Sequence, residues 1–82
     1  MIYSPKQLAN QLRLLRLQHN WTQEDVAKRV GVKQSTISNF ENNPDKIQLI
    51  TLFKILQALK VELQIVVQSQ KINVEPEDDE DW

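Results

Sequence analysis

Cysteine is missing from the sequence, and glycine and histidine each occur only once. Without cysteine, neither a disulfide framework nor a thiolate metal site can form. No apolar run approaches the roughly 18 residues of a membrane-spanning helix, and the N-terminus lacks the basic region and apolar core of a signal peptide. We therefore expect a cytoplasmic protein that does not engage a membrane.

Catalytic groups are equally scarce. The one histidine, His19, falls near the expected end of a helix, and no pair of carboxylates is set on a rigid apolar wall. The acidic residues near the C-terminus could hold a divalent cation only weakly. We therefore predict that the chain is not an enzyme and that it needs no metal or other cofactor.

Charge is divided unevenly along the 82 residues. Residues 1–74 contain all ten Lys and Arg and five acids, a balance of +5, whereas residues 75–82 contain six acids and no base, a balance of −6. The net charge of −1 therefore hides a basic body, which suits a polyanionic partner. We divide the chain into one small domain at 1–70 and an acidic tail at 71–82, which lacks the apolar content to order itself.

The stretch from Trp21 to Asn43 has the spacing of two short helices joined by a tight turn. Ala27 is small where the two backbones would approach most closely, and Gly31 follows where the chain must leave the first helix in a left-handed conformation. Glycine adopts that conformation at little cost, whereas other L-residues lose roughly 1–2 kcal/mol. We predict helices at 23–30 and 33–42, arranged as a helix-turn-helix.

The outer face of the second helix carries uncharged hydrogen-bonding side chains. On a helical wheel Ile37 and Phe40 point inward, while Ser35 and Asn39 point almost opposite them, and Gln34 can swing outward. A helix that only covers a core usually exposes Lys and Glu, whereas Gln, Asn, Ser and Thr can recognise base edges in a major groove. The pattern favours a DNA-recognition helix over an ordinary polar surface.

The C-terminal third predicts a helix and then a strand. Apolar residues nearly encircle the helix expected at 48–59, so it should be buried on more than one side. At 61–68 the period changes from 3.6 to 2, and one face of the strand collects Val61, Leu63, Ile65 and Val67. A lone strand leaves backbone groups unpaired, which the same strand of a second copy would satisfy. We predict an intersubunit sheet in a homodimer, with a strand packed singly on its own body as the alternative.

The ends of the chain add two expectations. Ser4 and Pro5 open a first helix with an N-cap and a proline at the first helical position, and Pro44 interrupts the chain after the helix-turn-helix. The fold class is therefore mainly α, with four to five helices and one C-terminal β-strand. Trp82 closes the acidic tail, and we weigh a partner-binding anchor evenly against chance for it.

These residues together resemble the Cro/C1-type helix-turn-helix family and, within it, the HipB-type antitoxins. The likeness covers nearly the whole chain and lies in I-Y-S-P-K-Q-L-A-N, N-W-T-Q, K-Q-S-T-I-S-N-F-E-N-N-P-D, F-K-I-L-Q-A-L and the closing Trp. Such a resemblance implies a dimer that joins through a C-terminal strand and binds a palindromic operator in double-stranded DNA. It also implies repression of the protein's own operon and neutralisation of a HipA-like serine/threonine kinase toxin.

The resemblance also implies roles for single side chains. Gln23 would lie at a helix N-terminus near a phosphate, and Arg16 and Glu41 would form a partly buried pair that ties the first helix to the recognition helix. Lys33, Gln34 and Ser35 would approach bases. The predicted DNA-binding residues are Gln23, Lys33, Gln34, Ser35, Thr36, Ser38 and Asn39.

Two other functions fit the same residues. The chain could be a free-standing regulator of phage type with no toxin partner, or a protein-interaction module that kept the fold and lost DNA binding. An overlapping reading frame for a kinase would separate the first from an antitoxin. Salt-dependent binding to duplex DNA would argue against the second.

Overall fold

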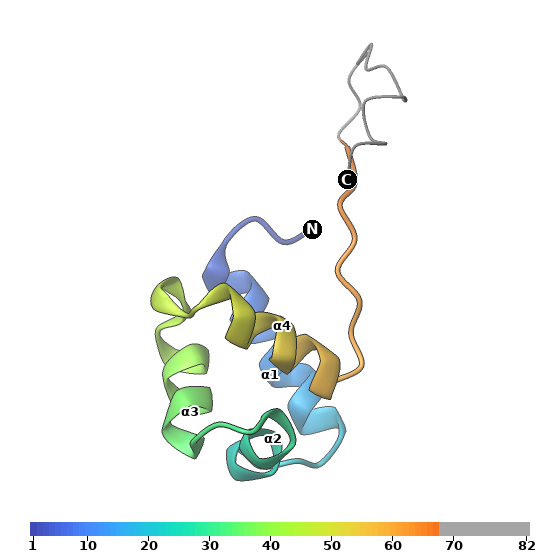
Figure 1. The fold of residues 1–82 in the computed structure, drawn as a ribbon. Helices are drawn as coiled ribbons and strands as arrows, with labels where there is room; N and C mark the ends of the chain where they lie inside the picture. The colour runs from blue at the N-terminus through green and yellow to red at the C-terminus, as the bar shows by residue number, and fades with distance from the viewer. Residues whose placement is uncertain (68–82) are drawn as a thin grey trace, which may run out of the picture.

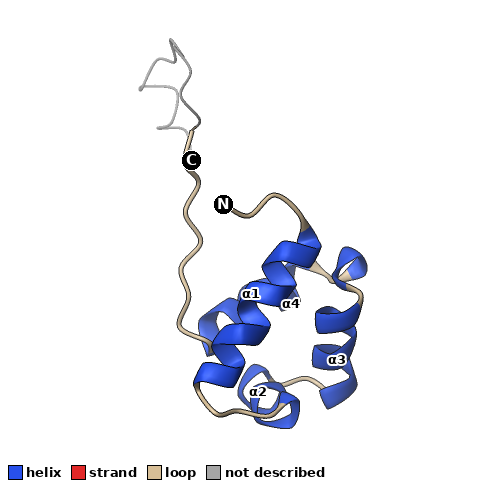
Figure 2. Cartoon of the chain, turned by 180° about the vertical axis from the view of Figure 1, so that it is seen from behind, coloured by secondary structure: helices blue, strands red, loops and turns tan. Residues whose placement is uncertain are grey.

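Four α-helices and one 3-10 turn follow each other along residues 1–67, the part of the chain that the computed structural model describes (Figure 1). Within these residues Figure 2 shows helices and loops only, so the predicted mainly α class is confirmed. The bounds are α1 at Pro5–Gln18, α2 at Gln23–Val30, α3 at Gln34–Asn42, η1 at Pro44–Lys46 and α4 at Leu49–Ala58.

The helices α1 and α2 begin at side-chain caps. The Ser4 hydroxyl accepts from the backbone N–H of Gln7 at 3.1 Å. At α2 the Thr22 hydroxyl accepts from the Asp25 N–H at 3.0 Å, and the Asp25 carboxylate accepts from the Thr22 N–H at 2.8 Å. This reciprocal pair satisfies two N–H groups that a helix start otherwise leaves free, and such caps are worth about 1 kcal/mol each.

Two left-handed residues turn the chain between helices. Asn20, at φ 61°, ends the corner after α1, and Gly31, at φ 87°, ends α2. The Gly31 N–H donates to the Ala27 carbonyl at 2.8 Å, and the Val32 N–H donates to the same oxygen at 3.0 Å. The left-handed Gly31 agrees with the sequence prediction, and together the two residues set the directions in which α2 and α3 start.

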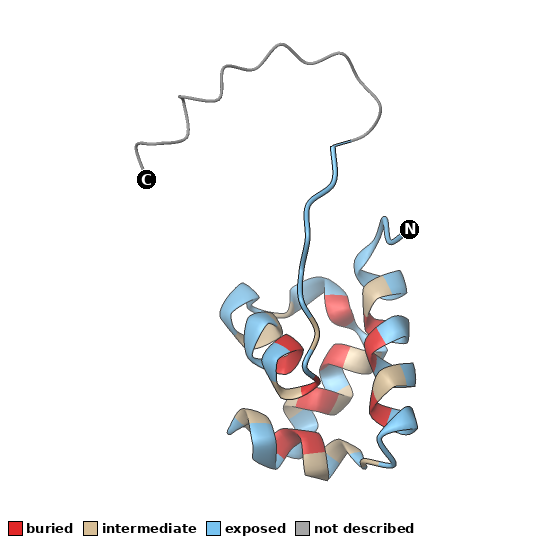
Figure 3. Cartoon of the chain, turned by 90° about the vertical axis from the view of Figure 1, so that its right-hand side faces the viewer, coloured by how far each residue is buried: buried red, intermediate tan, exposed pale blue. Residues whose placement is uncertain are grey.

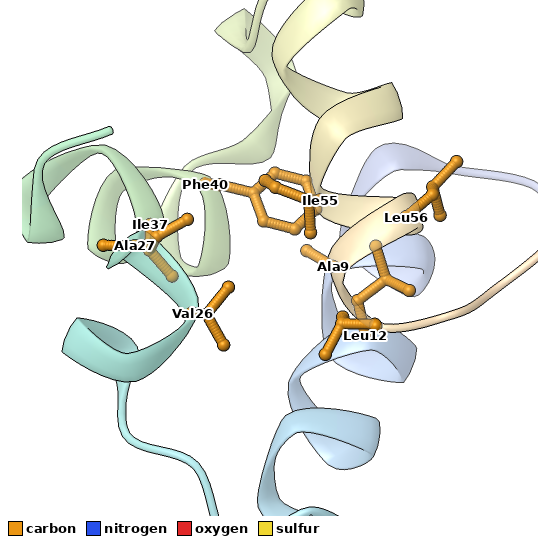
Figure 4. Packing of buried hydrophobic residues seen from close by; sticks show 9 residues of the cluster. Ala9, Leu12, Val26, Ala27, Ile37, Phe40, Ile55 and Leu56 are labelled. Carbon is orange, nitrogen blue, oxygen red and sulfur yellow. The ribbon is translucent and has the colours of Figure 1, made fainter. Parts of the chain in front are cut away.

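The core lies where all four helices meet (Figure 4). Ala27 is 2% exposed and lets α2 approach α3, while Phe40 extends from α3 toward Ile55 of α4. Burial of an aliphatic or aromatic side chain of this size contributes about 1.5–3 kcal/mol. The buried set is Ala9, Leu12, Val26, Ala27, Ile37, Phe40, Ile55, Leu56 and Leu59.

Helix α4 keeps a second apolar side outside the core. Ile55 and Leu56 are buried, whereas Leu49 and Ile50 are more than 60% exposed and Phe53 is 41% exposed. The helix is therefore apolar on more sides than one domain covers. The predicted burial of its second side is not seen in the single chain and stays a prediction, because it needs a partner. No helix within residues 1–67 combines the length and the apolar character that crossing a membrane requires.

The segment after α4 leaves the helical body. The Val61 N–H still donates to the Leu56 carbonyl at 2.9 Å, and Val61 packs on the core. From Glu62 to Val67 the chain runs away from the helices (Figure 3), and Ile65 is 89% exposed. The alternative of a strand packed on its own body therefore does not hold for the described residues. Residues 61–67 are not a strand in the single chain, so the predicted C-terminal strand is not seen there. The strand and the intersubunit sheet stay a prediction, because they need a second chain to pair with. The predicted tail at 71–82 and Trp82 lie outside the described residues.

Candidate nucleic-acid interface

The outer face of α3 is open to solvent along its length. Lys33 is the N-cap of α3, and Lys33, Gln34, Ser35 and Asn39 are all exposed, whereas Thr36 and Ser38 are half-buried. Ile37 and Phe40 are buried on the other side of the helix. We call the set Lys33, Gln34, Ser35, Thr36, Ser38 and Asn39 the recognition face. Its arrangement follows from the helical period, and it matches the face expected from the sequence.

A run of hydrogen bonds joins the core to the recognition face. The Gln34 side-chain N–H donates to Gln23 Oε1 at 2.6 Å, and the Gln23 Nε2 donates to Glu41 Oε1 at 2.9 Å. Arg16 then donates to Glu41 through Nε at 2.7 Å and through Nη2 at 3.1 Å. We call these four side chains the amide relay. It links α1, α2 and α3, and it brings Gln23, at the N-terminus of α2, against Gln34.

The inner half of the amide relay is a buried ion pair. The side chains of Arg16 and Glu41 are only 9% and 6% exposed. Arg16 also donates through Nη1 to the Trp21 carbonyl at 2.8 Å, so its fork meets three acceptor oxygens. A buried pair is stable only when its remaining donors and acceptors are satisfied. The contact confirms the pair that the family resemblance implied and fixes α3 on α1.

Trp21 contacts two side chains at the corner between α1 and α2. Its ring stacks on His19 with centroids 4.3 Å apart and planes 15° apart, and the Arg29 guanidinium carbon lies 3.9 Å from the ring centroid. Trp21 is also packed against the core. These contacts agree with a packing role for Trp21 rather than a ligand platform.

Asp25 is the titratable group at this surface whose pKa is shifted by its surroundings. Its pKa is lowered from the ordinary 3.8, first because its carboxylate accepts from the Thr22 backbone N–H and then through the Thr22 side chain, while Lys28 and Arg29 add a smaller effect of the same sign. The carboxylate therefore stays ionised at the N-terminus of α2, where the helix dipole favours negative charge. Between positions 1 and 67, no cluster of His, Asp or Glu is placed to hold a metal ion.

Two hollows flank the recognition face. One, of about 570 Å³, lies between α3 and the start of α4, and its lining includes Asn39, Asn43, Lys46 and Thr51. The other, of about 650 Å³, lies between the α1–α2 corner and α3, and its lining includes Gln23 and Gln34. Sequence reasoning missed Asn43, Lys46 and Thr51. The signal that could have pointed to them is that they are polar residues close to Pro44, where the chain is interrupted between two helices.

Comparison with known proteins identifies the family. A family model described as Helix-turn-helix matches residues 12–66, a range that contains all of α2, α3 and α4. The antitoxin HipB of Escherichia coli K12 is 58% identical over 64 residues, which cover 78% of this chain and 73% of that protein. The chain belongs to the HipB antitoxin family of helix-turn-helix proteins.

Solved structures of HipB support the same family assignment. The HipB chain in a structure titled as a HipA–HipB–O2–O3 complex superposes with a TM-score of 0.79 at 54% identity, over 83% of this chain and 96% of that chain. A structure titled as a HipB–O4 20mer complex has the same score, identity and coverage. The predicted Cro/C1-type fold and the resemblance to HipB are thus confirmed, and the relatives named here are antitoxins rather than enzymes.

Proposed function

We propose that this HipB-family protein is a sequence-specific DNA-binding autorepressor and the antitoxin of a HipA-like serine/threonine kinase. One observation carries the proposal: α3 exposes an uncharged, amide-rich face whose leading residue, Gln34, is held at 2.6 Å by Gln23. The relatives support both halves, since one HipB structure is titled as a complex with a 20mer and another as a complex with HipA.

In this function α3 enters the major groove of an operator. Gln34, Ser35 and Asn39 would contact base edges, because Gln and Asn side chains can pair bidentately with adenine. Lys33, Thr36 and Ser38 complete the surface, and Gln23 meets a phosphate at the positive end of α2. Lys46 and Thr51 line the hollow beside Asn39, where they would contact the phosphate backbone of the DNA on the side of α3 away from Gln23. Phosphate contacts orient the protein, and base contacts give specificity.

Two copies are needed to recognise an inverted repeat. The strand face of Val61, Leu63, Ile65 and Val67 would pair with its equivalent in a second chain. This segment follows directly on α4 (Figure 1), which has exposed apolar side chains of its own. Pairing would bury side chains that are now exposed and would satisfy the free backbone groups of an edge strand. The dimer would place its two α3 helices about one helical turn, 34–36 Å, apart.

The antitoxin role assigns the chain no chemistry of its own. We propose that it is not an enzyme, needs no cofactor and works in the cytoplasm, associated with the nucleoid when bound to DNA. The kinase would be held by the protein, and Trp82 at the end of the acidic tail is the proposed anchor.

A binding experiment tests the DNA half of the proposal. The full-length protein is titrated against a duplex from the region upstream of its own gene and against random duplex, for the parent and for Gln34→Ala. We expect the variant to lose roughly 1–3 kcal/mol of discrimination between the two duplexes. Asn10→Ala, on the exposed outer side of α1, is the matched control and should retain it. Equal binding of both duplexes by parent and variant would refute the assignment.

A pull-down tests the antitoxin half and separates it from a free-standing phage-type regulator. Full-length protein and a version that ends at Lys71 are used to capture the kinase encoded beside the gene. Capture by the full chain supports the antitoxin role, and loss of capture by the shorter version assigns the contact to the tail. Failure of both to capture a kinase would favour the free-standing regulator. A module that has lost DNA binding would show no salt-dependent affinity for duplex.

A further inference from the structure

The buried Glu41 carboxylate fixes the direction of the amide relay, that is, which side chain donates and which accepts at each of its hydrogen bonds. Glu41 is an ionised acceptor with no N–H or O–H to donate, and it accepts from both Arg16 and Gln23. Gln23 must therefore turn its NH₂ group toward Glu41. Its carbonyl oxygen is then left for Gln34, which can reach it only as a donor, as the 2.6 Å contact shows.

The direction of the amide relay decides which groups of Gln34 remain free. One N–H of Gln34 is used on Gln23, which leaves its carbonyl oxygen and its second N–H for a partner. An adjacent acceptor and donor match adenine, which presents the N7 acceptor and the N6 donor in the major groove. Guanine presents two acceptors, N7 and O6, so its O6 would face the amide oxygen of Gln34 without a proton between them.

We infer that Glu41, which itself lies on the buried side of α3, is a positioning residue that makes Gln34 select adenine over guanine. This inference rests on the proposed DNA-binding function and adds a specificity determinant to it. An isolated glutamine can rotate its amide by half a turn and exchange its donor and acceptor. Here the exchange would place two NH₂ groups or two oxygens in contact at some point of the amide relay.

The bidentate grip of Arg16 anchors the direction. The Arg16 guanidinium is always charged and has only N–H donors, and it donates to both oxygens of the Glu41 carboxylate. The anchor is 9% exposed on the Arg16 side and 6% exposed on the Glu41 side, so water does not compete freely for these atoms. The orientation set inside the domain is therefore transmitted through Gln23 to the exposed Gln34.

Glu41→Gln is the variant that should invert the amide relay. Glutamine at this position must offer its oxygen to Arg16, which leaves its NH₂ for Gln23. Gln23 then presents its oxygen inward and its NH₂ to Gln34, and Gln34 accepts with its oxygen. Both N–H groups of Gln34 become free, an arrangement that suits the two acceptors of guanine.

The test is the base preference at the position that Gln34 contacts. Full-length parent, Gln34→Ala, Glu41→Gln and Gln23→Leu are each used to select bound duplexes from a random pool, and adenine and guanine are then compared by competition at that position. The parent should prefer adenine by about 5- to 150-fold. Glu41→Gln should shift the ratio toward guanine, and Gln23→Leu, which frees the Gln34 amide while keeping side-chain volume, should bring the ratio close to 1.

The outcomes separate this inference from the proposed function. If the parent enriches no sequence, or if Gln34→Ala changes no base preference, the DNA-reading role itself is wrong. If Gln34→Ala removes the adenine preference but Glu41→Gln and Gln23→Leu keep the parent ratio, only the positioning role of Glu41 is overturned. A purely structural role would lower affinity for all duplexes alike without moving the ratio. Should Glu41→Gln fail to fold, Gln23→Leu alone decides, because Gln23 is half-buried at the surface.

Discussion

Replacing Arg16 by methionine should destabilise the domain far more than a surface change does. The substitution leaves the Glu41 carboxylate, 6% exposed, with the Gln23 N–H as its remaining side-chain donor, and it removes the donor to the Trp21 carbonyl. Breaking one side of a buried pair costs about 3–5 kcal/mol. A chain of this length has roughly 4–12 kcal/mol of total stability, at about 0.05–0.15 kcal/mol per residue. Arg16→Met should therefore lose about a quarter or more of the free energy of unfolding.

Urea denaturation at fixed protein concentration measures this loss, since the proposed dimerisation would make stability depend on concentration. Arg13→Met, an exposed change on the same helix, is the control and should stay within about 0.5 kcal/mol of the parent. The double variant Arg16→Met/Glu41→Leu should recover most of the loss, because apolar residues can replace a buried pair at little cost. The reasoning is refuted if Arg16→Met behaves like Arg13→Met, or if the double variant loses the sum of the two single losses.

Three further predictions concern the turn, the cap and the dimer. Gly31→Ala should lower the free energy of unfolding, measured in urea, by about 1–2 kcal/mol, because φ is +87° and alanine is strained there even though nothing lies within 4 Å of the added Cβ. Gly31→Asn should lower it by less. Folding lowers the pKa of Asp25, so its ionised carboxylate stabilises the fold at pH values above the unfolded pKa near 3.8, and this stabilisation is lost as the pH falls through the folded pKa. Asp25→Asn should therefore have a lower free energy of unfolding than the parent at pH 6 and the same value at pH 2. Ile65→Lys should yield monomers in light scattering, whereas Val66→Lys, on the other strand face, should leave the dimer intact. A cost for Gly31→Ala below that of Gly31→Asn, a constant Asp25→Asn difference across pH, or a dimeric Ile65→Lys would each contradict its prediction.

The features predicted correctly from the residues alone are those that local backbone chemistry fixes. The Ser4 cap, the left-handed Gly31 and the small Ala27 each depend on a few neighbouring residues, and α2 lies at the predicted 23–30. The recognition face also follows from the period of a single helix. Such features need no knowledge of how distant segments pack.

The amide relay could not be predicted in the same way. Gln23 and Gln34 are separated by a turn, and their contact depends on the angle at which α2 and α3 cross. The pairing of Arg16 with Glu41 came from family resemblance rather than from any pattern in the chain. The hollow around Lys46 depends on the direction of α4 after Pro44. Residues 61–67 form no strand in the described chain. The missing information is a second chain, because apart from the Val61 N–H, which donates to the Leu56 carbonyl, their backbone groups have no partner within residues 1–67.

The most direct test of the central claim is the set of duplexes that the full-length protein enriches from a random pool. A two-fold DNA reader built on α3 should enrich an inverted repeat whose half-site centres lie about one helical turn, 34–36 Å, apart. Gln34→Ala should lose the preference at one symmetric pair of positions and keep the others. Enrichment of an asymmetric sequence, or of no sequence at all, would contradict the account.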